Sequence, residues 1–477
     1  MSAARSIAIN FASLSVAEVF SKIVQFILFI LIARAFGPVQ FGIFGFAIAF
    51  ATIVSIIADF GIGIYLVREI SRNREKASEL LGNALFLKIL LAVSTFLVAG
   101  LYFWAMGFDR GTIIVSVLMI LFFVIQSITD VFYSIFRAFE KMHFDALIKI
   151  VRMILLVIAV AYLMRTYQSL IITTLAFPLV EVVMIIVAAS ICVMKFVPIS
   201  FKATPTVCKR MLKNSALFCL SIVFGSLLAY ISTVILQHVR GAGEVGPYAA
   251  AYTMLLGVVA IPLMMGNAIF PVFSRYHKNR RSLSFAFSKI YYYMLIMGLP
   301  LSVGIFWYAD PLIRLLYGSG YEQAILATKI LCWFVALRFI NVIAGVTLAA
   351  VGRQKQRVLS QGVVVAINIV LNLVLIPLYG FIGAGIATIA AESFFLLMYN
   401  FYLRKYGISA KLLQHIVKPG VAVGLMTLAI WFVPNMFLGA MLGALTYCIG
   451  LVVLKALGKE DVSLIMRLIK KKDTVKI

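Results

Sequence analysis

Long apolar segments follow one another along almost the whole chain. A helix needs about 20 apolar residues to cross the hydrocarbon core of a membrane. Hydrophobic residues make up 64% of the 477 residues and charged residues only 12%, too few to cover the surface of a soluble protein of this length. The sequence therefore predicts an all-α polytopic membrane protein with fourteen transmembrane helices. They are predicted near residues 11–33, 42–66, 81–104, 112–137, 146–165, 170–194, 215–238, 247–273, 289–309, 324–350, 358–378, 382–403, 415–434 and 437–457.

One helical hairpin of the chain occurs twice, 204 positions apart. The repeated positions are Asn10, Gly37 and Gly42, which recur as Asn214, Gly241 and Gly246. A constant offset through a loop and two helices is hard to obtain from shared hydrophobicity alone, and internal repeats are common in transporters. We therefore predict a chain built by duplication, with two lobes.

The predicted lobes fix a domain organisation. Residues 1–194 form the first lobe, with six helices, and residues 214–403 form the second. The basic segment 195–213 joins them, because the repeat restarts at Asn214 and prolines interrupt helix in this segment. Residues 404–457 add two helices, and residues 458–477 form a basic tail.

The distribution of positive charge predicts the orientation. Most of the 42 lysines and arginines lie in alternate loops and in the tail, and few lie in the opposite loops. Loops rich in Lys and Arg stay in the cytoplasm, so we predict a cell-membrane protein, in a bacterial inner membrane or an archaeal plasma membrane, with both termini cytoplasmic. Apolar residues at helical spacing in the tail leave two readings open, a helix on anionic lipid or a frayed basic end.

The sequence also argues against nucleic-acid binding, metal binding and catalysis. The net charge of +25 is dispersed over short loops, which argues against nucleic acid. The five cysteines lie in or beside apolar runs without metal-ligand spacing, so we interpret them as helix packing. No phosphate-binding loop and no catalytic constellation is present. We expect no enzyme activity, no metal site and no cofactor.

Four cations are predicted to lie inside the membrane: Lys22, Lys88, Arg152 and Arg338. A charge near the bilayer centre costs at least about 2.5 to 3.5 kcal/mol on insertion scales, so it faces protein or a watery cavity, usually with a partner. Lys22 and Arg338 lie near mid-depth. Lys88 and Arg152 lie closer to the cytoplasmic end, where they could also snorkel to the interface.

The first helix carries a polar stripe made by Glu18, Lys22 and Gln25. Glu18 and Lys22 stand at i, i+4, where side chains of a helix meet. Two readings remain open: a self-neutralised pair that locks helix to helix, or a pair lining a cavity that releases Lys22 to an anion. Glu18 is then a candidate for ion coupling.

Two further acids, Glu181 and Glu392, fall near mid-depth in equivalent helices of the two lobes. A buried carboxylate without a partner tends to stay protonated, which makes both candidates for proton or sodium coupling. The alternative is that each pairs with a cation, Arg338 being the natural partner of Glu392. Asn341 lies on the same helix face as Arg338.

Two stretches of the chain carry distinctive motifs: residues 58–63 (ADFGIG) ahead of residues 68–71 (REIS), and residues 367–388 (INIVLNLVLIPLYGFIGAGIAT). With the loop around Phe41 and Gly42 and the segment 137–141, they resemble the polysaccharide-transporter family of lipid-linked oligosaccharide flippases, which move O-antigen or exopolysaccharide repeat units. That family belongs to a superfamily with multidrug and toxin extruders and the lipid II flippase. The similarity runs essentially end to end.

The resemblance implies two six-helix lobes related by a pseudo-twofold, two extra C-terminal helices and alternating access around a central cavity. The implied substrate is a polyprenyl-pyrophosphate-linked oligosaccharide, moved from the inner to the outer leaflet with a proton or sodium gradient as the energy source. Polysaccharide assembly proteins are possible partners beside membrane lipids. The predicted substrate-binding residues are Lys22, Gln25, Lys88, Arg152, Arg338 and Asn341, because a basic cavity suits a pyrophosphate anion.

Two competing functions remain open. A cation-coupled multidrug extruder shares the fold but handles apolar cations, so its cavity would carry net negative charge. A membrane-embedded glycan polymerase or transferase would normally need a sizeable outer loop with acids or Arg, and the outer loops here are short.

Overall fold

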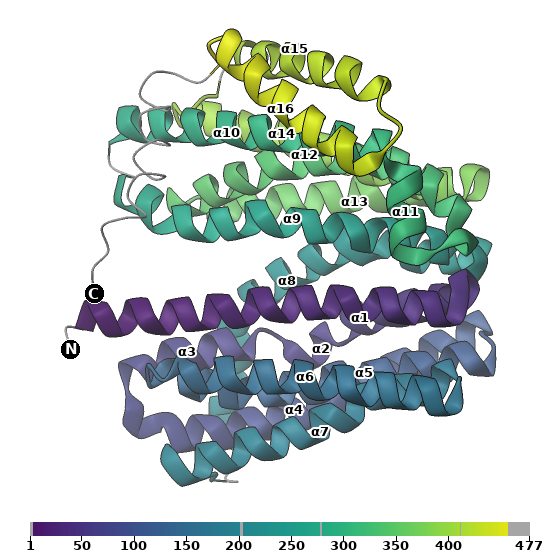
Figure 1. The fold of residues 1–477 in the computed structure, drawn as a ribbon. Coiled ribbons are helices and arrows are strands. Elements are labelled where there is room, and N and C mark those ends of the chain that lie inside the picture. The colour runs from purple at the N-terminus through teal and green to yellow at the C-terminus, as the bar shows by residue number, and fades with distance from the viewer. Residues whose placement is uncertain (1–2, 201–203, 277–278, 411, 457–477) are drawn as a thin grey trace, which may run out of the picture. The chain divides into compact units, whose positions relative to one another are not determined.

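The computed structural model describes residues 3–200, 204–276, 279–410 and 412–456, and within these ranges the chain is helical without a β-strand (Figure 1). The predicted all-α class is confirmed. The elements are α1 (Ala3–Val54), α2 (Ile56–Asp59), α3 (Ile62–Arg72), η1 (Arg74–Lys76), α4 (Ala77–Met106), α5 (Arg110–Ala138), α6 (Met142–Tyr167), α7 (Leu170–Lys195), α8 (Pro205–Arg240), α9 (Ala242–Tyr276), α10 (Arg280–Trp307), α11 (Ala309–Tyr317), η2 (Ser319–Tyr321), α12 (Glu322–Ala350), α13 (Gln354–Tyr379), α14 (Phe381–Lys405), α15 (Leu412–Trp431) and α16 (Met436–Val453).

Within the described ranges, twelve helical stretches are long and apolar enough to cross a membrane. The first of these runs from Val16 to Arg72 and contains two helical passes, because Gly37 interrupts it. The shorter apolar helix α15 is not among the twelve. The exact total of fourteen spans stays a prediction.

The repeated hairpin has the same backbone conformation in both copies. Gly37 has φ 73° and ψ 177°, and Gly241 has φ 79° and ψ −180°. Glycine reaches this positive φ without steric cost, and the next residue, Pro38 or Ala242, starts a new helix. The offset found in the sequence is therefore a structural repeat as well.

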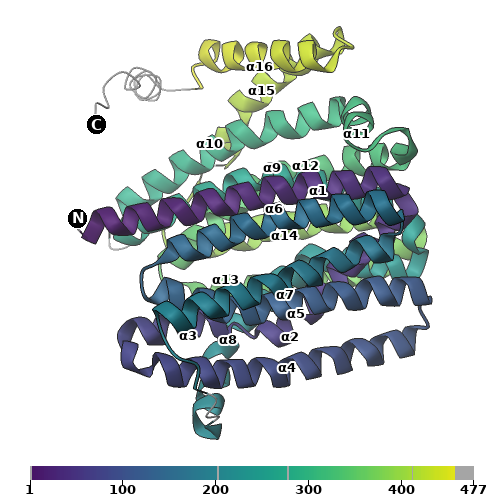
Figure 2. The same ribbon diagram turned by 60° about the horizontal axis from the view of Figure 1, so that its bottom comes forward.

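The second membrane pass begins in α1 after Gly37 and is interrupted between α2 and α3. Phe60 and Gly61 both have left-handed backbone conformations, with φ 46° and 67°. Figure 2 shows the two short helices one after the other near α4, against which both pack. This break is the local structure of the ADFGIG motif.

The chain forms two compact units. One comprises residues 1–257, 316–327 and 361–387, and the other comprises residues 258–315, 328–360 and 388–477. In the first unit α5 packs on α7, and α1 packs on α5 and α6. In the second, α10, α15 and α16 enclose an apolar cluster of Tyr308, Ala422, Met426, Ile430 and Tyr447.

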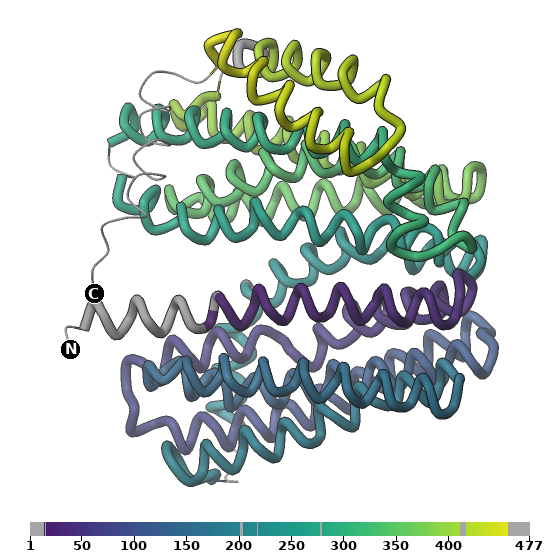
Figure 3. The backbone as a smooth tube through the Cα atoms, viewed as in Figure 1, coloured from purple at the N-terminus to yellow at the C-terminus, as the bar shows by residue number. Residues whose placement is uncertain are grey.

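The predicted linker 195–213 is anchored to α4 on both sides of its undescribed residues. Ser78 donates a hydrogen bond to the Pro198 backbone carbonyl (2.8 Å), and the side-chain Oδ1 of Asn83 accepts from the Thr204 backbone N–H (2.7 Å). The division into two lobes, a linker and two added helices stays a prediction. The basic tail lies outside the described residues, where Figure 3 draws the trace in grey.

Candidate functional site

A polar cluster of the second unit joins α12 to α14. Arg338 donates from Nη1 to the carboxylate of Glu392 at 2.9 Å, and Asn341 donates from Nδ2 to the other carboxylate oxygen at 2.7 Å. The Asn341 amide also donates to the Glu392 carbonyl at 2.8 Å. The Glu392 side chain is buried, whereas Arg338 is half-buried with 31% of its side chain exposed. Of the two readings of Glu392, the structure shows the paired one.

Glu181 has a partner as well, in the first unit. Arg152 of α6 approaches the Glu181 carboxylate of α7 at 3.4 Å, and both side chains are buried. The second carboxylate oxygen of Glu181 and Nε of Arg152 have no hydrogen-bond partner within the described residues. The pair is thus looser than that of Arg338 and Glu392.

Lys88 is buried at the helix break and makes two contacts with one residue. Its Nζ donates to the Asp59 carbonyl at 3.0 Å and to the Asp59 carboxylate at 3.1 Å, with 1% of the side chain exposed. At the other side of the break, a Cβ on Gly63 would lie 2.6 Å from Oδ2 of Asp130. Lys88 therefore binds the C-terminal residue of α2, and the Asp130 carboxylate lies against the N-terminal end of α3, where it complements that helix dipole.

Glu18 and Lys22 do not form the ion pair that their spacing allows. Glu18 contacts Nζ of Lys149 on α6 at 3.6 Å instead. Lys22 is exposed and has no ion pair in the part of the chain that the structure describes. Among the four predicted membrane cations, Lys22 alone is left without an anionic partner there. Gln25, one turn further, is half-buried.

A continuous chain of charged side chains connects three helices of the first unit. Arg137 contacts Asp130 at 3.2 Å and Asp145 at 2.7 Å, and Lys149 contacts Asp145 at 3.3 Å and Glu18 at 3.6 Å. Signs alternate along the whole path from α5 through α6 to α1. This chain of ion pairs begins at Asp130, beside Gly63 and the break, and ends at Glu18, one helical turn from Lys22.

Sequence reasoning missed most of this chain. Arg137 and Lys149 lie at the cytoplasmic ends of predicted spans, where their charges predict topology but neither their burial nor their partners, and the structure buries most of both side chains. Asp145 is fully buried between them, although it lies just outside the predicted span 146–165. The i, i+4 spacing of Asp145 and Lys149 was the available signal. The prediction that Lys88 and Arg152 could snorkel to the interface is wrong, because both charged groups bind buried or half-buried carboxylates within the protein.

The predicted site residues fall into two groups. Lys88, Arg152 and Asn341 are buried and bonded to protein groups, whereas Lys22, Gln25 and Arg338 retain exposed surface. Their roles in binding stay predictions. Within the described ranges no three His, Cys, Asp or Glu side chains gather as metal ligands, and Cys192, Cys208 and Cys332 are buried free thiols.

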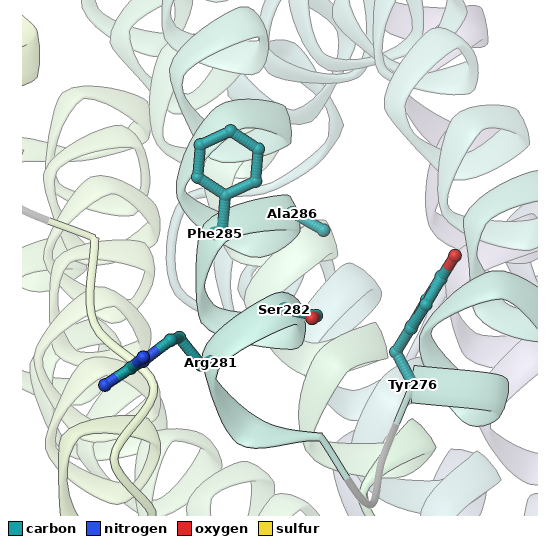
Figure 4. A pocket seen from close by; sticks show the side chains of 5 residues that line it. All are labelled: Tyr276, Arg281, Ser282, Phe285 and Ala286. Carbon is teal, nitrogen blue, oxygen red and sulfur yellow. The ribbon is translucent and has the colours of Figure 1, made fainter.

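An open pocket of about 490 Å³ lies at the start of α10. Its lining residues are Tyr276, Arg281, Ser282, Phe285 and Ala286. Figure 4 shows Arg281 extending away from Tyr276, so that the guanidinium does not close the pocket. None of the predicted site residues lines it.

Comparisons with known proteins agree with this architecture. The family model of polysaccharide biosynthesis proteins matches residues 7–277, more than half of the chain, and the MatE family model matches residues 218–374. An uncharacterized membrane protein of Methanocaldococcus jannaschii is 22% identical over 77% of this chain and 78% of its own. A probable low-salt glycan biosynthesis flippase, Agl15 of Haloferax volcanii, is 24% identical over 91% of this chain and 93% of its own.

Solved structures show the same fold. The lipid II flippase MurJ in an inward closed conformation superposes with a TM-score of 0.79 at 17% identity, over 92% of this chain and 98% of that one. An inward-facing multidrug resistance transporter of the MATE family gives a TM-score of 0.66 at 17% identity, over 83% and 98% of the two chains. The chain therefore belongs to the polysaccharide biosynthesis protein family and has the fold of the flippases and multidrug transporters of the MOP superfamily.

Proposed function

We propose that this protein flips a polyprenyl-pyrophosphate-linked oligosaccharide from the inner to the outer leaflet of the cell membrane, for the synthesis of a cell-surface polysaccharide. Family membership and the similarity to a probable glycan biosynthesis flippase over most of both chains support this substrate class. The proposal includes cytoplasmic termini, which the loop charges favour.

The observation that carries the proposal is the isolated charge of Lys22. The other membrane cations are neutralised by Asp59, Glu181 and Glu392. Lys22 has an exposed side chain, and Glu18, the anion nearest to it along the helix, contacts Lys149 instead. A charge inside a membrane is expensive, so it normally faces the protein interior or a watery cavity, where an anionic ligand can pair with it. A pyrophosphate supplies that anion, and the apolar cations handled by a drug extruder do not.

We further propose that a proton or sodium gradient drives alternating access, with Glu18 as the carboxylate best placed to couple. Its side chain is 59% exposed and its contact with Lys149 is long, so it can exchange protons or ions with water. Glu181 and Glu392 are buried and bonded to arginines, an arrangement that favours a structural part for both. Protonation of Glu18 would remove a charge that repels the pyrophosphate near Lys22, so that binding of the ion and binding of the ligand depend on each other.

The test is translocation of a polyprenyl-pyrophosphate oligosaccharide in proteoliposomes, with imposed proton or sodium gradients. Wild-type protein should translocate faster with one of the gradients than without. Lys22→Gln should abolish translocation, and Lys22→Arg, which keeps the charge, is the matched control and should retain part of it. Unimpaired translocation by Lys22→Gln would refute the binding assignment.

The coupling assignment is tested in the same vesicles. Glu18→Gln should translocate at a rate that no longer responds to the gradient, whereas Glu392→Gln should remain gradient-dependent. A wild type that ignores both gradients would rule out ion coupling.

A further inference from the structure

The two copies of the repeated hairpin touch each other through glycines. A Cβ on Gly42 would overlap the carbonyl oxygen of Ala242 and lie 2.9 Å from the backbone nitrogen of Gly246. A Cβ on Gly246 would overlap the carbonyl oxygen of Pro38 and lie 3.2 Å from its Cα. Neither position can hold even an alanine unless the two backbones separate.

This contact is reciprocal. Ala242 and Gly246 lie 204 positions after Pro38 and Gly42 and are their equivalents in the second copy. Gly42 contacts Ala242, and its equivalent Gly246 contacts Pro38, the equivalent of Ala242. One further turn along, a Cβ on Gly45 would lie 3.0 Å from Cβ of Ala249, again its own equivalent. Such exchange of equivalent positions is the mark of a contact centred on a twofold axis. We call the three pairs 38/242, 42/246 and 45/249 the glycine seam.

Each side of the seam is fixed to a neighbouring element of the same compact unit. On one side, Arg34 donates to the Leu316 carbonyl and Tyr321 donates to the Ala33 carbonyl, both at 2.8 Å. On the other, Arg240 donates to the Pro377 carbonyl at 2.6 Å. The Glu244 carboxylate accepts from the Phe381 backbone N–H at 2.8 Å. Arg240 and Glu244 bind within their own predicted lobe, whereas the bonds of Ala33 and Arg34 reach Leu316 and Tyr321 of the predicted second lobe, across the same junction as the seam. These bonds must therefore break together with the seam when it parts.

We propose that the glycine seam is the closing surface of the outer gate, and that Gly42 and Gly246 set how tightly that gate shuts. The proposal rests on the proposed transport function and on the predicted orientation, which places residues 37–42 and 241–246 at the outer ends of their helices. Small residues let two helix backbones meet closely. Release of a bulky sugar to the outside then requires the seam to part, and each new cycle requires it to close again.

A disulfide across the seam tests whether it opens. In a background with the five native cysteines replaced by alanine, Gly45→Cys and Ala249→Cys are combined. Disulfide-bonded cysteines have Cβ atoms about 3.5 to 4.5 Å apart, so the 3.0 Å spacing needs only a small adjustment. The cross-link should form readily under mild oxidation, stop translocation and be reversed by reduction. Failure to cross-link would overturn the proposal. So would translocation by the fully cross-linked protein that is as fast as translocation by the same protein with the disulfide reduced.

Alanine substitutions test closure without reference to any substrate. A single reporter, Ala249→Cys, is labelled from outside with a membrane-impermeant thiol reagent. Labelling should be slow in the parent and faster with Gly42→Ala or Gly246→Ala. Gly243→Ala is the matched control, because a Cβ there meets nothing within 4 Å, and its labelling should equal that of the parent.

Equal labelling of all variants would overturn the seam as a gate, as would labelling only from the inside. If the labelling pattern holds but the wild type moves no lipid-linked oligosaccharide, the gate stands and the substrate assignment fails. The two parts of the argument are therefore tested separately.

Discussion

Arg338 and Glu392 form a 2.9 Å ion pair between α12 and α14, and Asn341 donates two hydrogen bonds to the same glutamate. Removing one member leaves a buried charge unpaired, which costs about 3 to 5 kcal/mol. Arg338→Met should therefore lower thermal stability in detergent sharply, and adding Glu392→Leu should restore much of it. A double variant no more stable than Arg338→Met would contradict this account.

The pair of Lys88 and Asp59 should matter for folding more than for transport. Lys88→Met removes the cation at the C-terminal end of α2 and leaves the Asp59 carboxylate without its ion-pair partner. We expect a loss of about 3 kcal/mol in folding stability, seen as a lower yield of folded protein by size-exclusion chromatography. Translocation per folded molecule should remain near that of the wild type. Normal yield together with abolished translocation would instead assign Lys88 to the substrate site.

The chain of ion pairs should be strong in its middle and weak at its end. Asp145 is fully buried between Arg137 and Lys149, so Asp145→Asn should cost about 3 to 5 kcal/mol. Glu18 is exposed and 3.6 Å from Lys149, so Glu18→Gln should cost less than about 1 kcal/mol. Denaturant unfolding in detergent measures both. Equal losses for the two variants would show that the chain does not have this graded burial.

Asp109 caps the N-terminus of α5 and should make stability depend on acid pH. Its carboxylate accepts from the Thr112 backbone N–H at 2.9 Å and also binds the Thr112 hydroxyl. Burial, the largest single influence, raises the pKa of Asp109, but the hydrogen bonds from Thr112 and the backbone outweigh it and hold the pKa below its ordinary value of 3.8. The cap therefore contributes fully above that pH and is lost as the pH falls through the lowered pKa.

The matching variants separate the cap from its charge. Asp109→Ala should lose about 0.5 to 2 kcal/mol at neutral pH, the usual worth of an N-cap. Asp109→Asn should keep most of that stabilisation at neutral pH, and the stabilisation should not fall in acid because Asn does not titrate. Melting temperatures between pH 2 and 7, a range that extends well below 3.8, compare the three proteins, and an identical acid response in wild type and Asp109→Asn would exclude Asp109 as the source.

The membrane-spanning helices were predictable because apolar length and loop glycines are local properties of the sequence. Gly37 and Gly241 marked the two hairpin loops, and both adopt the same backbone conformation. The break at Phe60 and Gly61 was less visible, because it interrupts an otherwise continuous apolar run. The sequence motif could be recognised there, but not the bend that it encodes.

The charged residues could be found from the sequence, but their partners could not. Glu18 and Lys22 have the i, i+4 spacing of an ion pair, yet Glu18 contacts Lys149 of another helix instead. Which carboxylate meets which cation depends on helix rotation and depth, and a difference of one turn changes the partner. The natural pairing of Arg338 with Glu392 was among the open alternatives, and the structure shows it.

The reciprocity of the glycine seam bears on how the chain arose. Two copies of a half-length chain with an even number of helices insert in the same orientation and can meet about a twofold axis along the membrane normal. They would then place their equivalents of Gly42 against one another's equivalents of Pro38, which is the contact that Gly42 and Gly246 now make within one polypeptide. The seam thus has the arrangement that a homodimer interface would leave behind if two such half-length chains were fused into one polypeptide, as the predicted duplication requires.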